Sequence, residues 1–258
     1  MVAELGHFAL ILGFVVAILV TIVPLVGAYM RWPGWMRFSE TGSNALFLLT
    51  VTSFGALTYA FVVSDFSVKL VWMNSHTAKP MLYKITGVWG NHEGSMLLWV
   101  LILTLFGAMA SWFGNGLPPT LKARILAVQA SITTAFMAFV LFTSNPFLRL
   151  DPAPLNGKDL NPLLQDPGLA FHPPFLYLGY VGLSMAFSFA DTGPSPKATA
   201  SSSFNILSSR ESACMRCLWA FSASSSIILA ATLGCLLSRE DSSQIVFGAI
   251  WEVSYAFL

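Results

Sequence analysis

Histidine is the side chain that most often ligates a metal or carries a proton at neutral pH, and this chain has four. They are His7, His76, His92 and His172. His92 is followed by Glu93, but Met96 stands four positions after His92, so the HExxH zinc motif is absent. A zinc site needs three or four nearby Cys, His or carboxylate ligands, which the loop before His172 does not offer. We predict no metal-ion site of this kind.

One segment combines chemically useful side chains with glycines. Residues 86–95 read Thr-Gly-Val-Trp-Gly-Asn-His-Glu-Gly-Ser. Glycine lets a backbone approach a neighbour closely, so the segment predicts a surface where Trp89 and His92 contact a ligand. A structural alternative stays open, in which Asn91 and Ser95 cap the following helix and Glu93 lies at its positive N-terminus.

The second such segment, residues 145–174, contains prolines at positions 146, 152, 154, 162, 167, 173 and 174. Proline disfavours regular helix and stiffens a loop, so we expect a rigid loop that ends at His172, with a helix beginning at Pro173-Pro174. A neutral imidazole held at a fixed height is what an axial ligand to heme iron requires. The alternative is that His172 only forms hydrogen bonds within the loop.

The amino-acid composition of the chain indicates the kind of protein in which these segments lie. Of 258 residues, 55% are hydrophobic and 10% are charged, and the mean hydropathy is +0.70. Soluble domains carry roughly 25% charged residues, so a water-soluble enzyme and a disordered chain are excluded. A net charge of +1 without Lys/Arg runs excludes a nucleic-acid binder. The chain is predicted to lie in a lipid bilayer.

Long runs without charge predict an all-α polytopic bundle, because roughly 20 apolar residues cross a membrane and must form helix there. Five spans are expected at 7–30, 43–63, 95–113, 125–143 and 175–190, and a sixth candidate at 218–237. The first run is too long for a cleaved signal peptide.

Lysines and arginines are denser in the short loops 31–40 and 114–124 than in the longer loops 65–93 and 145–172. Basic loops stay in the cytoplasm. We therefore expect the N-terminus and both long loops, with all four histidines, on the outer side. The reverse orientation is the alternative.

Four motifs resemble the N-terminal part of CcmF proteins of the CcmF/CycK/CcsA heme-handling family, over about residues 1–190. They are Trp89-Gly-Asn-His-Glu-Gly-Ser-Met-Leu-Leu-Trp99, Ser144-Asn-Pro-Phe147, Asp159-Leu-Asn-Pro-Leu-Leu-Gln-Asp-Pro-Gly168 and His172-Pro-Pro-Phe-Leu-Tyr-Leu-Gly-Tyr180. The pattern is most similar to the bacterial form, in the inner membrane with periplasmic loops; a mitochondrial inner membrane is the alternative.

The resemblance implies a subunit of a heme lyase in cytochrome c-type biogenesis. Such proteins hold heme as cofactor and present it to the CxxCH site of apocytochrome c. They work with a periplasmic heme chaperone and other heme-lyase subunits. The family's first external heme-ligating histidine matches His172, while Trp89 and His92 belong to a motif whose role the resemblance does not assign.

The resemblance ends near Ala190. The family's WWD loop, second external histidine and membrane histidines have no match, and residues 191–258 contain 15 serines against 12 in the preceding 190. Cys214-Met-Arg-Cys217 precedes Leu218, so it is not a CxxCH site. We expect a truncated or frame-shifted product, unable to act alone; a divergent membrane segment is the alternative.

A second functional class is a small transporter or membrane scaffold without heme chemistry. Coupled transporters place ionisable residues inside their spans. The expected spans contain no Asp, Glu, Lys or Arg, which favours heme handling at the outer surface.

The orientation can be tested with alkaline phosphatase fusions, which are active only outside the cytoplasm. Fusions after Ser75 and Asn156 should be active, and fusions after Arg37 and Lys122 inactive, because basic short loops are retained inside. The opposite pattern would contradict the orientation and the outer position of His172.

Overall fold

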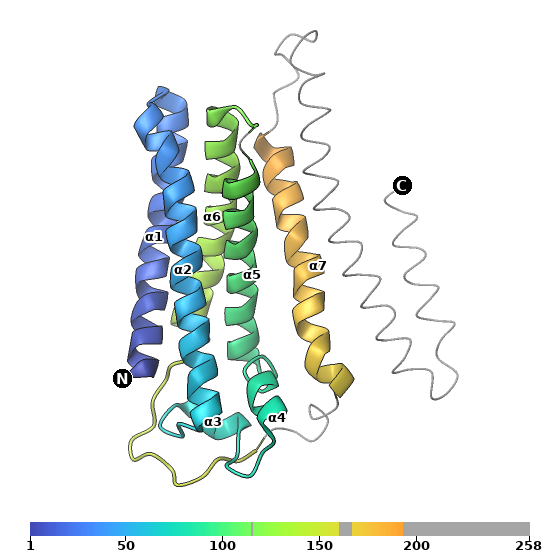
Figure 1. Cartoon of the computed structure of the whole chain (residues 1–258). Coiled ribbons are helices and arrows are strands. Elements are labelled where there is room, and N and C mark those ends of the chain that lie inside the picture. Colours follow the sequence, from blue (N-terminus) through green and yellow to red (C-terminus); the bar gives the residue numbers. More distant parts are fainter. Residues whose placement is uncertain (115, 160–166, 193–258) are drawn as a thin grey trace, which may run out of the picture.

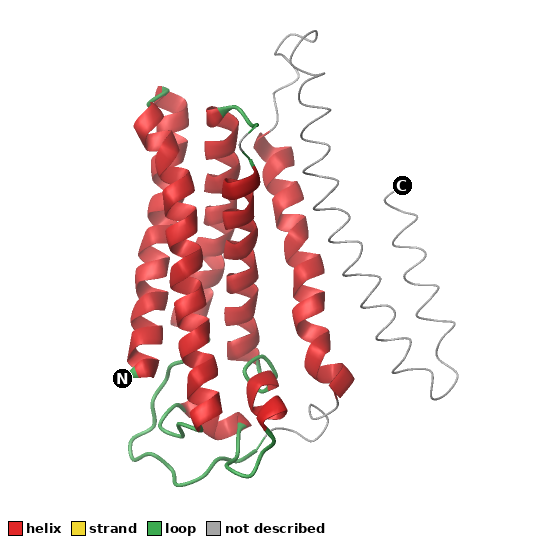
Figure 2. Cartoon of the chain, viewed as in Figure 1, coloured by secondary structure: helices red, strands yellow, loops and turns green. Residues whose placement is uncertain are grey.

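The computed structural model describes residues 1–114, 116–159 and 167–192, and every regular element in them is a helix (Figure 2). The all-α prediction is therefore confirmed. The elements are α1 (Val2–Met30), α2 (Pro33–Val63), α3 (Lys69–Asn74), α4 (Met81–Thr86), α5 (His92–Phe113), α6 (Pro119–Phe142) and α7 (Pro167–Thr192).

The five long helices form an antiparallel bundle, in which α1 packs on α2 and α6 while α7 packs on α5 and α6 (Figure 1). The N-terminus, α3, α4 and the segment 143–159 lie together at one end, which we name the loop end. The turn 31–32, the end of α5 and the start of α6 lie at the other. The expected grouping of the N-terminus with both long loops is thus observed, while the side of the membrane stays a prediction.

Four helices, α1, α2, α5 and α6, are long and apolar enough to cross a membrane. The predicted fifth span lies within the 26-residue helix α7, so its crossing remains a prediction. The sixth candidate, 218–237, lies outside the described residues.

Charged residues are poor markers of where these helices end. Helix α2 begins at Pro33 rather than near Ser43, so the expected loop 31–40 shrinks to a two-residue turn. The helical turns beyond the apolar run remain paired, since Lys122 Nζ of α6 lies 2.9 Å from a carboxylate oxygen of Glu40 on α2. This ion pair fastens the two helices at the end opposite the loop end.

The expectation for the proline-rich segment was wrong at its C-terminal end. Helix α7 begins at Pro167, six residues before Pro173, so His172 is the sixth residue of a helix and not the last residue of a loop. Pro167 occupies the first helical position, where a missing N–H is unused. Pro173 and Pro174 each remove one hydrogen bond to the preceding turn, which the helix tolerates.

Candidate functional site

The loop end is held together by pairing between the two long loops. Lys69 N–H donates to Leu148 O and Leu150 N–H donates to Ser67 O, each at 2.8 Å. Further along, Lys158 N–H donates to Trp72 O at 2.8 Å. Segments about 80 residues apart in sequence therefore form one layer over the ends of the helices.

Two lysines reinforce this layer. Lys79 has a side chain only 1% exposed, and its Nζ lies 2.9 Å from Asp159 Oδ1 and 3.2 Å from Asn74 O. Lys158 Nζ lies 4.3 Å from the centre of the Trp72 ring, a cation–π contact. The stiffness expected from prolines alone is thus supplied by specific partners as well.

Two of the four histidines meet at one tetrapeptide, Ser144-Asn-Pro-Phe147. Asn145 Nδ2 lies 3.1 Å from His7 Nε2 on α1, and the Phe147 ring stacks on the His7 ring at 6.0 Å. Asn145 Oδ1 accepts from Phe147 N–H at 2.9 Å, which fixes the orientation of the amide. With the amide in this orientation, its Nδ2 is the donor and His7 Nε2 is the acceptor.

The same tetrapeptide contacts His92 at the start of α5. Ser144 Oγ lies 3.4 Å from His92 Nδ1, and Phe139 packs its edge toward the imidazole at 6.1 Å between centres. His92 is otherwise exposed, and among the described residues its Nε2 has no protein partner. The sequence did not predict that Ser144 and Asn145 hold these two histidines; the only signal was their place in a resembling motif.

The structural alternative for residues 86–95 is confirmed at Asn91 and wrong at Ser95. Asn91 Oδ1 accepts from Gly94 N–H at 2.7 Å as the N-cap of α5, while its Nδ2 donates to Gly87 O at 2.8 Å. Ser95 Oγ instead donates to His92 O at 2.9 Å, because it lies inside the first turn. A Cβ at Gly94 would lie 1.7 Å from Val88 O, so this tight approach requires glycine.

Trp89 and Trp99 lie beneath this layer. Trp89 is partly buried between the two apolar clusters of the bundle. The Trp99 ring lies 5.6 Å from Phe136 on α6 and 5.2 Å from Tyr177 on α7, measured between ring centres. These contacts bring α5, α6 and α7 together just below the loop end.

The remaining histidines differ in what the structure shows. His76 Nδ1 lies 3.2 Å from Ala78 N, and His76 Nε2 lies 3.0 Å from Asn156 Nδ2. His172 lies near the start of α7 at the loop end, and its side chain is outside the described part of the chain. No group of three or more metal-ligating side chains occurs among the described residues.

Comparison with known proteins decides the family. The family described as "Cytochrome C assembly protein" matches residues 89–220. The chain belongs to the cytochrome c assembly protein family. The match begins at Trp89 and includes His92, Ser144 and His172.

Relatives of this family member are named for cytochrome c biogenesis. It is 69% identical over 190 residues to the cytochrome c-type biogenesis protein ccl1 of Rhodobacter capsulatus and 44% identical over 191 residues to CcmF of Escherichia coli. Both matches cover 74% of this chain. The solved "Cytochrome c Heme Lyase CcmF" matches with a TM-score of 0.64 and 27% identity, over 74% of this chain and 30% of that one. The chain spans about 29% of the length of the relative ccl1.

These findings confirm the resemblance seen in the sequence. The match to ccl1 covers 190 residues, whereas the family match continues to residue 220, beyond the expected end near Ala190. No relative named here supports the alternative of a transporter or scaffold.

Two variants of Asn91 test how much its hydrogen bonds stabilise the start of α5. Asn91→Ala removes both the accepted and the donated hydrogen bonds, and should lower stability by about 1–2 kcal/mol. Asn91→Asp keeps the acceptor and loses only the donors, so its loss should be smaller. Thermal unfolding of the purified protein in detergent measures both.

Ser95→Ala is the control for this series, because Ser95 Oγ bonds only within its own helical turn. Equal melting temperatures for Asn91→Ala and Ser95→Ala would contradict the capping role of Asn91.

Proposed function

We propose that this chain supplies a heme-handling membrane part of a cytochrome c heme lyase. The observation that carries the proposal is the match to a protein titled "Cytochrome c Heme Lyase CcmF" over 74% of the chain. The histidines grouped at the loop end support it, because heme iron is ligated by imidazole.

The cavity between α2, α5 and α6 is too small for heme. It is lined in part by Ser43, Thr104 and Gln129 and has room for about one water molecule. We place the porphyrin at the loop end, beside its aromatic side chains and histidines. When bound, heme supplies the vinyl groups that become attached to the two cysteines of a CxxCH site.

The proposed residues have separate roles. His172 is the proposed axial ligand, by its match to the family histidine. His92 is a second proposed contact, because its Nδ1 is engaged by Ser144 while its Nε2 has no partner among the described residues. Metal-bound histidines generally have their other ring nitrogen hydrogen-bonded in this way. Trp89 supports this surface from below.

The proposed setting follows from the same family. The loop end faces the periplasm from a bacterial inner membrane, where a heme chaperone, apocytochrome c and other heme-lyase subunits meet the chain. Exposed arginines at the opposite end support this orientation. They are Arg31, Arg37 and Arg124.

The share of its relatives' length that the chain covers limits what we propose for it. The chain spans about 29% of the length of ccl1, so we propose for these residues a part of the lyase and not its whole activity.

Replacing His172 tests the ligand directly. His172→Ala, made at the matching position of a full-length relative, should reduce co-purified heme and holocytochrome c severalfold, because one of the iron's axial bonds is lost. Heme absorbance and heme-stained gels measure the two quantities.

His76→Ala is the matched control, since both His76 ring nitrogens lie within hydrogen-bond distance of loop groups. It should leave heme content near that of the parent. Equal heme content in His172→Ala and the parent would remove His172 from the site.

A further inference from the structure

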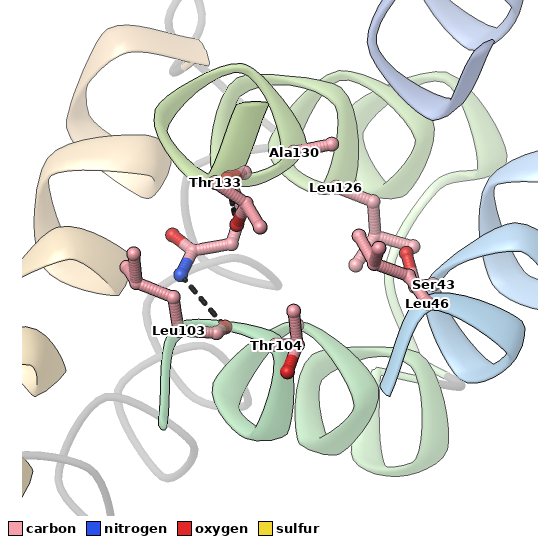
Figure 3. A pocket seen from close by; sticks show the side chains of 9 residues that line it. Ser43, Leu46, Leu103, Thr104, Leu126, Ala130 and Thr133 are labelled. Carbon is pink, nitrogen blue, oxygen red and sulfur yellow. Dashed lines mark hydrogen bonds between the residues drawn. The ribbon is translucent and has the colours of Figure 1, made fainter. Parts of the chain in front are cut away.

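A single buried amide joins three helices inside the membrane part of the bundle. Gln129 of α6 is 2% exposed, and its Nε2 donates to Leu103 O of α5 at 3.2 Å. Its Oε1 accepts from Ser184 Oγ at 3.1 Å and from Ser188 Oγ at 3.2 Å, both on α7. Figure 3 draws the hydrogen bond to Leu103 beside the narrow cavity between α5 and α6.

We propose that Gln129 is a positioning residue that fixes the rotation and height of α7, and with them the position of His172. This inference rests on the proposed function, because His172 matters only if it contacts heme. Ser184 and Ser188 lie one turn apart on α7, so one amide engages one face of that helix and selects its rotation.

The location of these groups makes the interaction selective. Hydrocarbon offers no alternative partner to a buried amide, so a rotated α7 would leave Gln129 Oε1 unsatisfied. The hydroxyls of Ser184 and Ser188 also lie within hydrogen-bond distance of backbone oxygens of α7, so the cost of rotation falls on the amide. Gly182 of α7 also packs near the Phe106 ring of α5, since a Cβ at this position would lie in van der Waals contact with the ring, at 3.4 Å. Apolar contacts alone would permit neighbouring rotations, because lipid chains compete equally for such surfaces.

The contact with Gln129 lies far from His172 along α7, so a small change in the tilt of α7 displaces His172 by a larger distance. Ser184 lies twelve residues after His172 on the same helix, which corresponds to about 18 Å at 1.5 Å per residue. A tilt of about 10° at Ser184 would move the start of the helix by about 3 Å, more than the length of an iron–nitrogen bond. Trp99, through its contact with Tyr177, supports the intervening turns.

Two variants of Gln129 separate hydrogen bonding from volume. Gln129→Met keeps the side-chain length and removes every hydrogen bond, whereas Gln129→Glu, protonated in the bilayer, can still donate and accept. The position of α7 is measured by electron–electron double resonance between spin labels at Tyr59→Cys on α2 and Leu176→Cys on α7. The background replaces Cys214, Cys217 and Cys235 by serine, and the 258-residue protein is held in nanodiscs.

We expect Gln129→Met to broaden and shift the distance distribution, and Gln129→Glu to retain the parent distribution. In heme titrations followed by Soret absorbance, Gln129→Met should weaken affinity about tenfold, as expected for the loss of two or three membrane hydrogen bonds. Gln129→Glu should restore the parent's affinity and Soret position.

Thr104→Val is the matched control, because Thr104 Oγ1 pairs at 2.7 Å with Thr50 Oγ1 of α2 and not with α7. It should change neither measurement. If Gln129→Met does not insert stably, the double variant Ser184→Ala/Ser188→Ala removes the same contacts from α7.

An unchanged distance distribution in the Gln129 and serine variants would overturn the inference. A shifted distribution with unchanged heme affinity would also overturn it, because α7 would then move without affecting the ligand. A shifted distribution in a protein whose parent binds no heme would support the role of Gln129 in placing α7 and contradict the proposed function.

Discussion

Hydrocarbon offers no hydrogen-bond partners, and this constraint organises the whole molecule. It makes the apolar runs helical and favours partners inside the bundle for buried polar side chains. Thr50 pairs with Thr104, and Gln129 pairs with two serines of α7. It also restricts charged and histidine chemistry to the ends of the helices, where water and lipid headgroups can solvate it.

The loop end is consequently the part of the structure where polar and histidine side chains gather. Residues from α1, α5 and two long loops meet there, and the tetrapeptide Ser144-Asn-Pro-Phe147 contacts both His7 and His92. The paired loops form a platform braced by the buried Lys79 ammonium. Such a platform can hold an imidazole at a fixed position beside a planar ligand without any cavity in the membrane.

The predictions that agree with the structure depend on composition, on the order of the apolar runs or on neighbouring residues. The four apolar helices found among the described residues, the all-α class and the position of the N-terminus with the two long loops all follow from long apolar runs and their order along the chain. Asn91 was also predictable as a cap, because its local hydrogen bond depends only on neighbouring residues.

Predictions were weaker where partners come from distant segments. Pro173 and Pro174 indicated a helix start, but α7 begins at Pro167, and proline rules give no measure of the packing that sustains the earlier turns. The charges of Arg37 and Glu40 indicated a loop, yet Glu40 pairs with Lys122 on a neighbouring helix. The contacts of Asn145 with His7 join residues 138 positions apart, and no local pattern encodes them.

We propose that these residues provide the part of a heme lyase that they match in relatives such as ccl1. In the most direct test, the 258-residue chain is expressed in a bacterium that lacks its own CcmF. The expression is done with and without a fragment that carries the C-terminal remainder of a relative such as ccl1. Heme staining of membrane proteins reports covalent attachment. We predict that c-type cytochromes return when the chain and the fragment are expressed together; the absence of heme-stained protein under that condition would contradict the account.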